Sequence, residues 1–343
     1  MRAKHLGRSL VVVLGAALLA LASAQADPFF EDMTLQSHGF GLEMVGVRLA
    51  AVEQFDPVPE GLSEVVEGLF EDDVPRFIGT LRAHKPFVAD GLVAALEAVE
   101  DGAEAGHVGI MKFAYARAWW GLAYDVLVPA ERRTTAYWGA VTADLLLADG
   151  GVGEALEEAI ADGEIWGYPG GWAALQRVEA IWAELLPLAN EDQASFGRQY
   201  LDTLHELFPS AQLPEVFPPN PEEAEAPAQS MVGVLESVTG ASLYTGRDLG
   251  FLAGYLADFV APACELYAAG KEELASETAF AARPHYRKHL RRLLDLVAPE
   301  VHEVAGGILD ELVEDEGDRP ADLAGACRAL HDALLEARAA LGG

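Results

Sequence analysis

Basic residues are scarce in this chain. Lys and Arg together number 23 against 55 Asp and Glu, so the formal net charge of the 343 residues is −32. A surface this acidic repels nucleic acids and anionic lipids, and it attracts cations and basic proteins. We therefore expect no nucleic-acid partner. High acidity also keeps an exported protein soluble, and by itself it identifies no ligand.

Motifs typical of catalysis are also lacking. The sequence contains no H-E-x-x-H zinc motif and no nucleophile elbow, and its Ser, His and Asp residues show no spacing typical of a catalytic set. None of the nine His residues has a Glu three positions further on. These absences predict a non-catalytic protein.

Long apolar runs are confined to the N-terminus. Residues 1–24 combine a positively charged start, an apolar stretch and the small residues Ala22, Ser23 and Ala24, as secretory signals do. We expect cleavage after Ala24, a periplasmic or extracellular location, and a mature charge of −35 because the leader carries three positive charges; an uncleaved anchor is the alternative. No later stretch is long and apolar enough to cross a bilayer, so no membrane insertion is expected after cleavage.

Cysteine is limited to two residues, Cys264 and Cys327, which lie 63 positions apart. In an oxidising compartment the two can form a disulfide, and the chain-entropy model values such a loop at roughly 4 kcal/mol. Each Cys also fits a helical apolar pattern, so two buried thiols are the alternative.

Alternating runs of β-branched residues, which would indicate strands, are scarce, and almost every stretch has helical periodicity. The predicted fold class is therefore all-α. Pro near the expected helix starts and Gly at the breaks agree with this. Helices are expected at residues 40–54, 61–72, 74–82, 86–99, 106–126, 131–148, 151–161, 171–189, 192–207, 228–239, 246–268, 284–297, 299–314 and 320–340.

Proline concentrates in one segment. Six of the 18 Pro residues fall within residues 208–230, where they exclude both helix and sheet. We predict two antiparallel helical bundles, residues 25–208 and 229–343, joined by a Pro-rich linker at 209–228. Its apolar residues are expected to dock the linker against a bundle: Leu213, Val216 and Phe217.

The expected helix at 171–189 carries a charge on its apolar face. At 100° per residue, its large apolar residues form one stripe: Trp172, Leu175, Val178, Trp182, Leu185 and Leu186. Glu179 falls within this stripe with Gln176 at its edge, whereas Arg177 points away. A carboxylate held away from water is costly unless a cation, strong donors or a metal meets it. Glu179 therefore has two interpretations, a structural ion pair and a ligand or metal site.

A second acid, Asp248, lies near the start of a C-terminal helix. Thr245 and Asp248 have capping-box spacing, which is the simpler interpretation of the acid. Asp248 also projects to the same side as Leu252, Tyr255 and Phe259. It is therefore a second candidate ligand that faces the helical interior.

Two blocks of the sequence, GWAALQRVEAIW at residues 171–182 and VLESVTGASLYTGRDLGFLAGYLADF at residues 234–259, together resemble the imelysin/EfeO-like family. Members of this family are exported all-helical proteins that are linked to bacterial iron uptake. The family's motif is G-x-H-x-x-E, and Ala174, Gln176 and Glu179 stand at the motif's Gly, His and Glu positions. The second block of the family is matched in this chain by Val238-Thr239-Gly240, Tyr244, Arg247-Asp248-Leu249 and Asp258-Phe259. The resemblance is best over residues 166–192 and 231–262.

The resemblance implies a non-catalytic binding component, linked to metal or iron uptake, that meets metal-uptake membrane components. It makes Glu179, Gln176 and Asp248 candidate metal ligands and Tyr244 and Arg177 candidate ligand-binding residues. The cofactor expected is a divalent metal or iron. Gln in place of the motif His removes an imidazole, and an amide oxygen suits calcium or magnesium better than zinc or iron.

Basic residues gather in the segment "RPHYRKHLRR", residues 283–292. The first interpretation is an intramolecular clamp onto the acidic surface, and the second is a site for an anion or an acidic partner. The alternative function of the protein, a metal-free helical scaffold, would dock its partner through this segment. Its candidate partner-binding residues are Arg283, Arg287, Lys288, Arg291 and Arg292.

Overall fold

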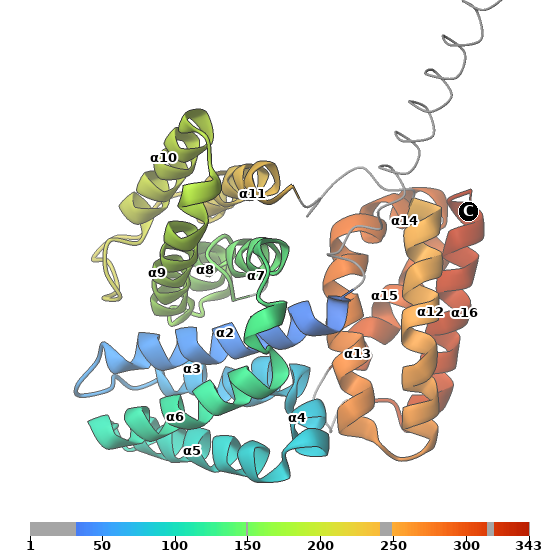
Figure 1. Ribbon diagram of the computed structural model, residues 1–343, viewed down its shortest axis with the longest axis horizontal. Helices are drawn as coiled ribbons and strands as arrows, with labels where there is room; N and C mark the ends of the chain where they lie inside the picture. Colours follow the sequence, from blue (N-terminus) through green and yellow to red (C-terminus); the bar gives the residue numbers. More distant parts are fainter. Residues whose placement is uncertain (1–31, 149, 241–248, 314–318, 343) are drawn as a thin grey trace, which may run out of the picture.

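The computed structural model describes residues 32–148, 150–240, 249–313 and 319–342, and every regular element in these ranges is a helix (Figure 1). The all-α prediction is confirmed. The expected signal peptide lies outside the described residues. The α-helices are α2 (Met33–Glu53), α3 (Ser63–Gly68), α4 (Ile78–His84), α5 (Pro86–Glu104), α6 (Ile110–Leu127), α7 (Thr135–Leu147), α8 (Ala155–Glu157), α9 (Gly167–Leu185), α10 (Glu191–Leu207), α11 (Glu225–Thr239), α12 (Leu249–Ala268), α13 (Glu272–His285), α14 (Arg291–Val297), α15 (Pro299–Glu311) and α16 (Leu323–Ala340).

Short 3-10 and π-helical turns continue or join these helices. The 3-10 turns are η3 (Val74–Arg76), η4 (Ala130–Arg132), η6 (Leu186–Leu188) and η7 (Pro221–Ala224). The π-helical turns are η2 (Leu69–Asp73), η5 (Glu158–Asp162) and η8 (Tyr286–Leu290). Several of them divide a helix that the sequence pattern predicts as one.

The α2 helix is the centre of the fold. It packs against α6, α7, α9 and α13, and it crosses the middle of the molecule between the α5–α6 pair and the helices α7 to α9 (Figure 1). Glycine makes this crowding possible, because a Cβ at Gly39 would clash with the Tyr137 ring and one at Gly41 with the backbone at Asp73. Nearly the whole length of α2 is therefore buried, including its polar residues Gln36 and Glu43.

The helices do not divide at the Pro-rich segment. The α11 helix follows that segment and packs against α7 and α10, so our assignment of residues 229–239 to a C-terminal bundle is wrong. The Pro-rich segment itself docks as expected at Leu213 and Phe217, and the Phe217 ring lies edge-on to Tyr168 with centroids 5.8 Å apart. Val216, in contrast, is exposed.

The helices from α12 to α16 pack together at one side of the molecule (Figure 1). The α12 helix lies between α13 and α16, and the Cys264–Cys327 disulfide joins α12 to α16. Of the two interpretations of these cysteines, the structure has the disulfide. By length and composition α12 could cross a membrane, contrary to our expectation, but half of its apolar window is buried here, as in the core helix of a bundle.

Buried polar pairs attach helices α12 to α16 to the rest of the molecule. His38 of α2 lies 3.1 Å from the Glu277 carboxylate of α13, and the Thr80 backbone N–H donates to the same carboxylate at 2.7 Å. Lys288 of η8 reaches across to Asp144 of α7 with an Nζ–Oδ1 distance of 2.7 Å. Because buried charges need partners, these contacts fix how α13 and η8 sit on α2 and α7.

The α13 helix was not expected, since we interpreted Pro284 as a helix start. Pro284 instead lies near the end of α13, and the chain continues through the π-helical η8 into α14. Proline has no backbone N–H, so the Phe280 carbonyl loses its usual helical donor. A π-helical turn next to such a break lets the helix continue. The sequence pattern was weak because α13 buries mostly small residues.

Burial of His285 at the end of α13 predicts a pH dependence of stability. Burial, assisted by Lys288 and His289, holds the pKa of His285 well below its ordinary value of 6.5. The folded imidazole thus stays neutral while the unfolded one takes up a proton below about pH 6.5, so stability falls as the pH falls. Each pH unit below that value costs at most about 1.4 kcal/mol. Urea denaturation at pH 7.5 and 5.5 should show a smaller difference in His285→Asn than in the unsubstituted protein, and equal differences would contradict this.

Candidate functional site

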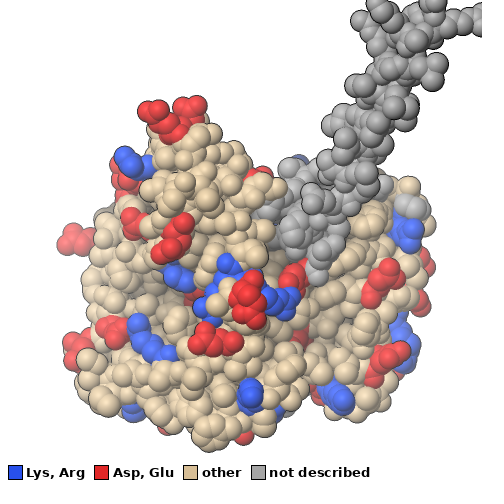
Figure 2. Space-filling model, in the orientation of Figure 1, with Lys and Arg blue, Asp and Glu red and all other residues tan. Residues whose placement is uncertain are grey.

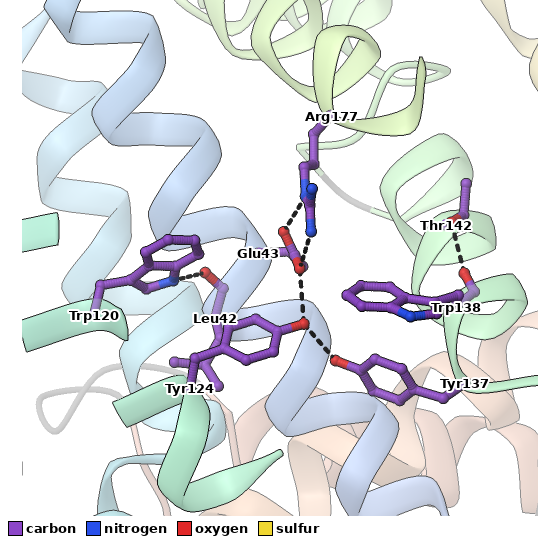
Figure 3. A network of polar contacts seen from close by, with 8 residues as sticks. All are labelled: Leu42, Glu43, Trp120, Tyr124, Tyr137, Trp138, Thr142 and Arg177. Atoms are coloured by element: carbon purple, nitrogen blue, oxygen red, sulfur yellow. Dashed lines mark hydrogen bonds and ion pairs between the residues drawn. The ribbon is translucent and has the colours of Figure 1, made fainter. Parts of the chain in front are cut away.

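The buried charge that the sequence pattern placed at Glu179 is found on α2, at Glu43. The Glu43 side chain is 1 % exposed and forms a bidentate ion pair with Arg177 of α9. Arg177 Nε lies 2.6 Å from Oε2 and Nη2 lies 2.8 Å from Oε1 (Figure 3). Two parallel N–H···O bonds of this kind are among the strongest that proteins make.

Two tyrosines complete the network around this carboxylate. Tyr124 of α6 donates its hydroxyl to Glu43 Oε1 at 2.8 Å, and its oxygen lies 2.7 Å from the hydroxyl of Tyr137 of α7 (Figure 3). Burial and the nearby Glu43 carboxylate raise the pKa of both tyrosines, so both stay protonated. Burial lowers the pKa of Arg177, but Glu43 and the two tyrosines together raise it by more, so the guanidinium stays charged. Four helices thus meet at one satisfied carboxylate.

An open cavity of about 500 Å³ lies beside this network, and we call it the aromatic cavity. It is lined from α6, from Arg133 just before α7, from α7 itself, and from α9. The lining residues are Trp120, Gly121, Tyr124 and Asp125 of α6, Arg133 and Trp138, and Arg177, Ile181 and Glu184 of α9. Small-molecule sites in proteins combine such apolar walls with a few fixed polar groups.

Hydrogen bonds and cation–π contacts fix the side chains of the cavity wall. The guanidinium of Arg177 lies 5.6 Å from the centre of the Trp138 ring, and that of Arg133 lies 4.8 Å from the Tyr124 ring. Arg133 also donates to the Val128 carbonyl at 2.8 Å, and the Trp120 indole N–H donates to the Leu42 carbonyl at 2.6 Å (Figure 3). The wall is therefore formed before any ligand binds, which reduces the entropic cost of binding.

Glu179 does not face the helical interior, so that expectation is wrong. Its side chain is 53 % exposed, and its Oε2 lies 3.3 Å from Nε2 of His205 on α10. The buried face of α9 includes the small residues Gly171, Ala173 and Ala174, which carry little weight in a pattern of large apolar residues. The true face is therefore rotated away from the predicted one, and Arg177 points inward with it.

Of the other residues that we predicted as ligands, the structure describes Gln176 and Arg177. Gln176 is partly buried on α9, one turn before Glu179. Arg177, which we predicted as ligand-binding, lines the aromatic cavity. Asp248 and Tyr244 lie outside the described residues. In the part of the chain that the structure describes, no group of three or more His, Cys, Asp or Glu side chains is placed to hold a metal ion.

The basic segment 283–292 serves largely as an intramolecular clamp, the first of our two interpretations. Asp310 Oδ1 accepts from Arg283 Nε at 2.8 Å and from Arg287 Nη2 at 3.0 Å, and Lys288 binds Asp144. Arg291 and Arg292 are exposed. Figure 2 shows basic side chains mostly beside acidic ones over the face that it presents.

Sequence reasoning missed the residues that build the site: Glu43, Trp120, Tyr124, Tyr137 and Trp138. The six Trp residues were interpreted as packing, and nothing in the spacing of α6 and α7 links the two tyrosines. A signal did exist for Glu43. It is the only Asp, Glu, Lys or Arg between Asp32 and Arg48, and a lone carboxylate in so long an apolar helix indicates a buried charge with a partner.

Comparison of the chain with protein-family models, with curated proteins and with solved structures found no match. The resemblance to the imelysin/EfeO-like family therefore stays a prediction.

The ion pair between Glu43 and Arg177 predicts a specific pattern of stability. Arg177→Met leaves the Glu43 carboxylate buried without its cation, and we expect it to lower the free energy of unfolding by about 3 kcal/mol, the low end for a buried pair because Arg177 is partly exposed. The double variant Glu43→Gln/Arg177→Met should lose less than Arg177→Met alone. Urea denaturation followed by circular dichroism measures both, and an equal or larger loss in the double variant would refute the explanation.

Proposed function

We propose that this protein is an exported, non-catalytic binding protein of the imelysin/EfeO-like kind, located in the periplasm or outside the cell, that holds a small molecule in the aromatic cavity. The observation that carries the proposal is the cavity itself, whose walls are fixed by the Glu43–Arg177 pair and by guanidiniums that lie over aromatic rings. A binding role is favoured over catalysis because the carboxylate and the two phenols are bonded to one another. None is left as an activated acid, base or nucleophile.

Gly121 allows the cavity to be blocked without disturbing the fold. It lies within α6 on the cavity wall, and a Cβ added there would meet no atom within 4 Å. Gly121→Leu should therefore fill the cavity, and it also removes a residue with low helix propensity. Gly233, inside α11, has the same open surroundings but lies away from the cavity. Gly233→Leu is a matched control.

We predict that Gly121→Leu abolishes the retention of small molecules by the purified mature protein, whereas Gly233→Leu does not change it. Native mass spectrometry, followed by release and identification of bound molecules, measures this. Thermal unfolding should show both variants at least as stable as the unsubstituted protein. Equal retention in all three proteins, or none in any of them, would contradict the proposed site.

A metal site at Glu179 is the second candidate function, and one contact favours it. The His205 Nε2 and Glu179 Oε2 atoms are 3.3 Å apart. Two ligands that each bind one ion at about 2.1 Å in tetrahedral geometry lie about 3.4 Å apart. His205 of α10 thus supplies beside Glu179 the imidazole that the motif lacks at Gln176. Imidazole and carboxylate together suit divalent iron or zinc, which fits a role beside metal-uptake membrane components.

A metal site formed by Glu179 and His205 predicts that both side chains contribute to the affinity for the ion. Isothermal titration with Fe²⁺ under anaerobic conditions, or with Zn²⁺, should show binding that Glu179→Ala and His205→Ala each weaken by about tenfold or more, the loss typical of a ligand. Glu206→Ala, next to His205 on α10, is the control. No binding, or binding that none of these variants changes, would end the metal candidate and leave the aromatic cavity unaffected.

The partner-docking alternative has less support. Three of the five basic residues in segment 283–292, Arg283, Arg287 and Lys288, already bind Asp310 or Asp144 of the same chain. A scaffold function through this segment would therefore depend on Arg291 and Arg292, at the start of α14.

A further inference from the structure

One wall of the aromatic cavity carries opposite charges at its two ends. Arg177, Ile181 and Glu184 of α9 line the cavity, and their spacing of four and three residues places them on one helical face. Arg177 and Glu184 are separated by two helical turns, a rise of about 10 Å. The buried, apolar Ile181 lies between them. A ligand along this wall would meet a cation, an apolar surface and an anion in turn.

Arg177, the positive end of this wall, uses only some of its hydrogen-bond donors. Arg177 binds Glu43 through Nε and Nη2, and the side chain stays 34 % exposed. Within the described residues, Nη1 has no hydrogen-bond partner. The guanidinium can therefore donate to a ligand carboxylate without giving up the pair with Glu43, because it carries five N–H groups.

The negative end of this wall is the carboxylate of Glu184. Glu184 is exposed at the cavity wall, and its carboxylate forms no ion pair or hydrogen bond with any residue that the structure describes. The other acid of the wall, Asp125, binds Arg133 with an Nη2–Oδ1 distance of 2.7 Å. The two guanidiniums of the wall are thus balanced by Glu43 and Asp125, and the Glu184 charge stays unbalanced.

The charges of the cavity wall favour some classes of ligand over others. A plain carboxylic acid would enter a cavity that already has an excess of negative charge, and a plain amine would gain nothing from Arg177 Nη1. A molecule that carries both groups satisfies both ends. The apolar part of the cavity wall, which includes Ile181, Trp120 and Trp138, suits an unbranched hydrocarbon body.

We propose that the aromatic cavity binds a small zwitterion in which a hydrocarbon chain separates a carboxylate from an ammonium group. This rests on the proposed function, since it names the class of ligand for the same cavity. The carboxylate accepts a hydrogen bond from Arg177 Nη1, and the ammonium group pairs with Glu184. The chain between them packs on the apolar part of the cavity wall.

The test uses one zwitterion and its two halves. Isothermal titration of the mature protein with 6-aminohexanoate, hexanoate and hexylamine compares the three compounds at the same pH and salt. We expect 6-aminohexanoate to bind about tenfold or more tightly than either of the others, because each charged hydrogen bond contributes to the affinity. Gly121→Leu should abolish the binding of all three.

Glu184→Gln removes the ammonium partner from an exposed position, so it should fold normally. It is expected to weaken 6-aminohexanoate binding about five- to tenfold and to leave hexanoate binding equal or tighter. Glu206→Gln is the matched control, because it makes the same change at an exposed position of α10, outside the cavity. It should leave all three affinities unchanged.

Three results would overturn the inference: hexylamine or hexanoate binding as tightly as the zwitterion, no effect of Glu184→Gln, or no binding of 6-aminohexanoate at all. If the unsubstituted protein retains a molecule that Gly121→Leu does not, while 6-aminohexanoate fails to bind, the ligand class is wrong and the proposed function stands. If retention also fails, both are wrong.

Discussion

The need to pair one buried carboxylate determines how the centre of this protein is built. Glu43 is almost completely buried, and an unpaired charge there would cost several kcal/mol. Its partners come from three other helices: Arg177 of α9 directly, Tyr124 of α6 directly, and Tyr137 of α7 through Tyr124. These four helices can therefore pack in only one register. The aromatic cavity follows from this register, because the same guanidinium and ring form part of its wall.

Helix α2 extends the same constraint to the C-terminal helices. Its polar residues Gln36 and His38 are also buried, and they bind Asp144 of α7 and Glu277 of α13. Lys288 approaches Asp144 from η8. Apolar packing has little directional preference, whereas each of these pairs has one good geometry. The C-terminal helices are thus oriented on α2 by hydrogen bonds as well as by apolar contact.

The sequence pattern predicts most of the regular helices, with α13 as the exception, and misses what depends on packing between them. The helices expected at residues 86–99 and 299–314 are found as α5 and as α15, which ends at Glu311, and in both a Pro at the start and one clear apolar face agree. The α2 helix has no such contrast, since it is buried on all sides, and so Glu43 is not distinguished by its face. On α9, buried Gly and Ala residues shift the true face and reverse the roles of Arg177 and Glu179. No periodicity within one helix can place Tyr124 beside Tyr137.

Helix α9 carries both candidate sites, and its geometry keeps them apart. Arg177, Ile181 and Glu184 face the aromatic cavity, whereas Glu179, displaced by about 200° from Arg177, faces His205 of α10. The helix body separates the two, so the occupant of one cannot contact that of the other. Any coupling between them would have to pass through a movement of α9, and Glu43 opposes such movement by holding Arg177 at two points. Because the two sites share no ligand-binding residue, the missing motif His at position 176 affects the metal candidate alone and leaves the chemistry of the cavity intact.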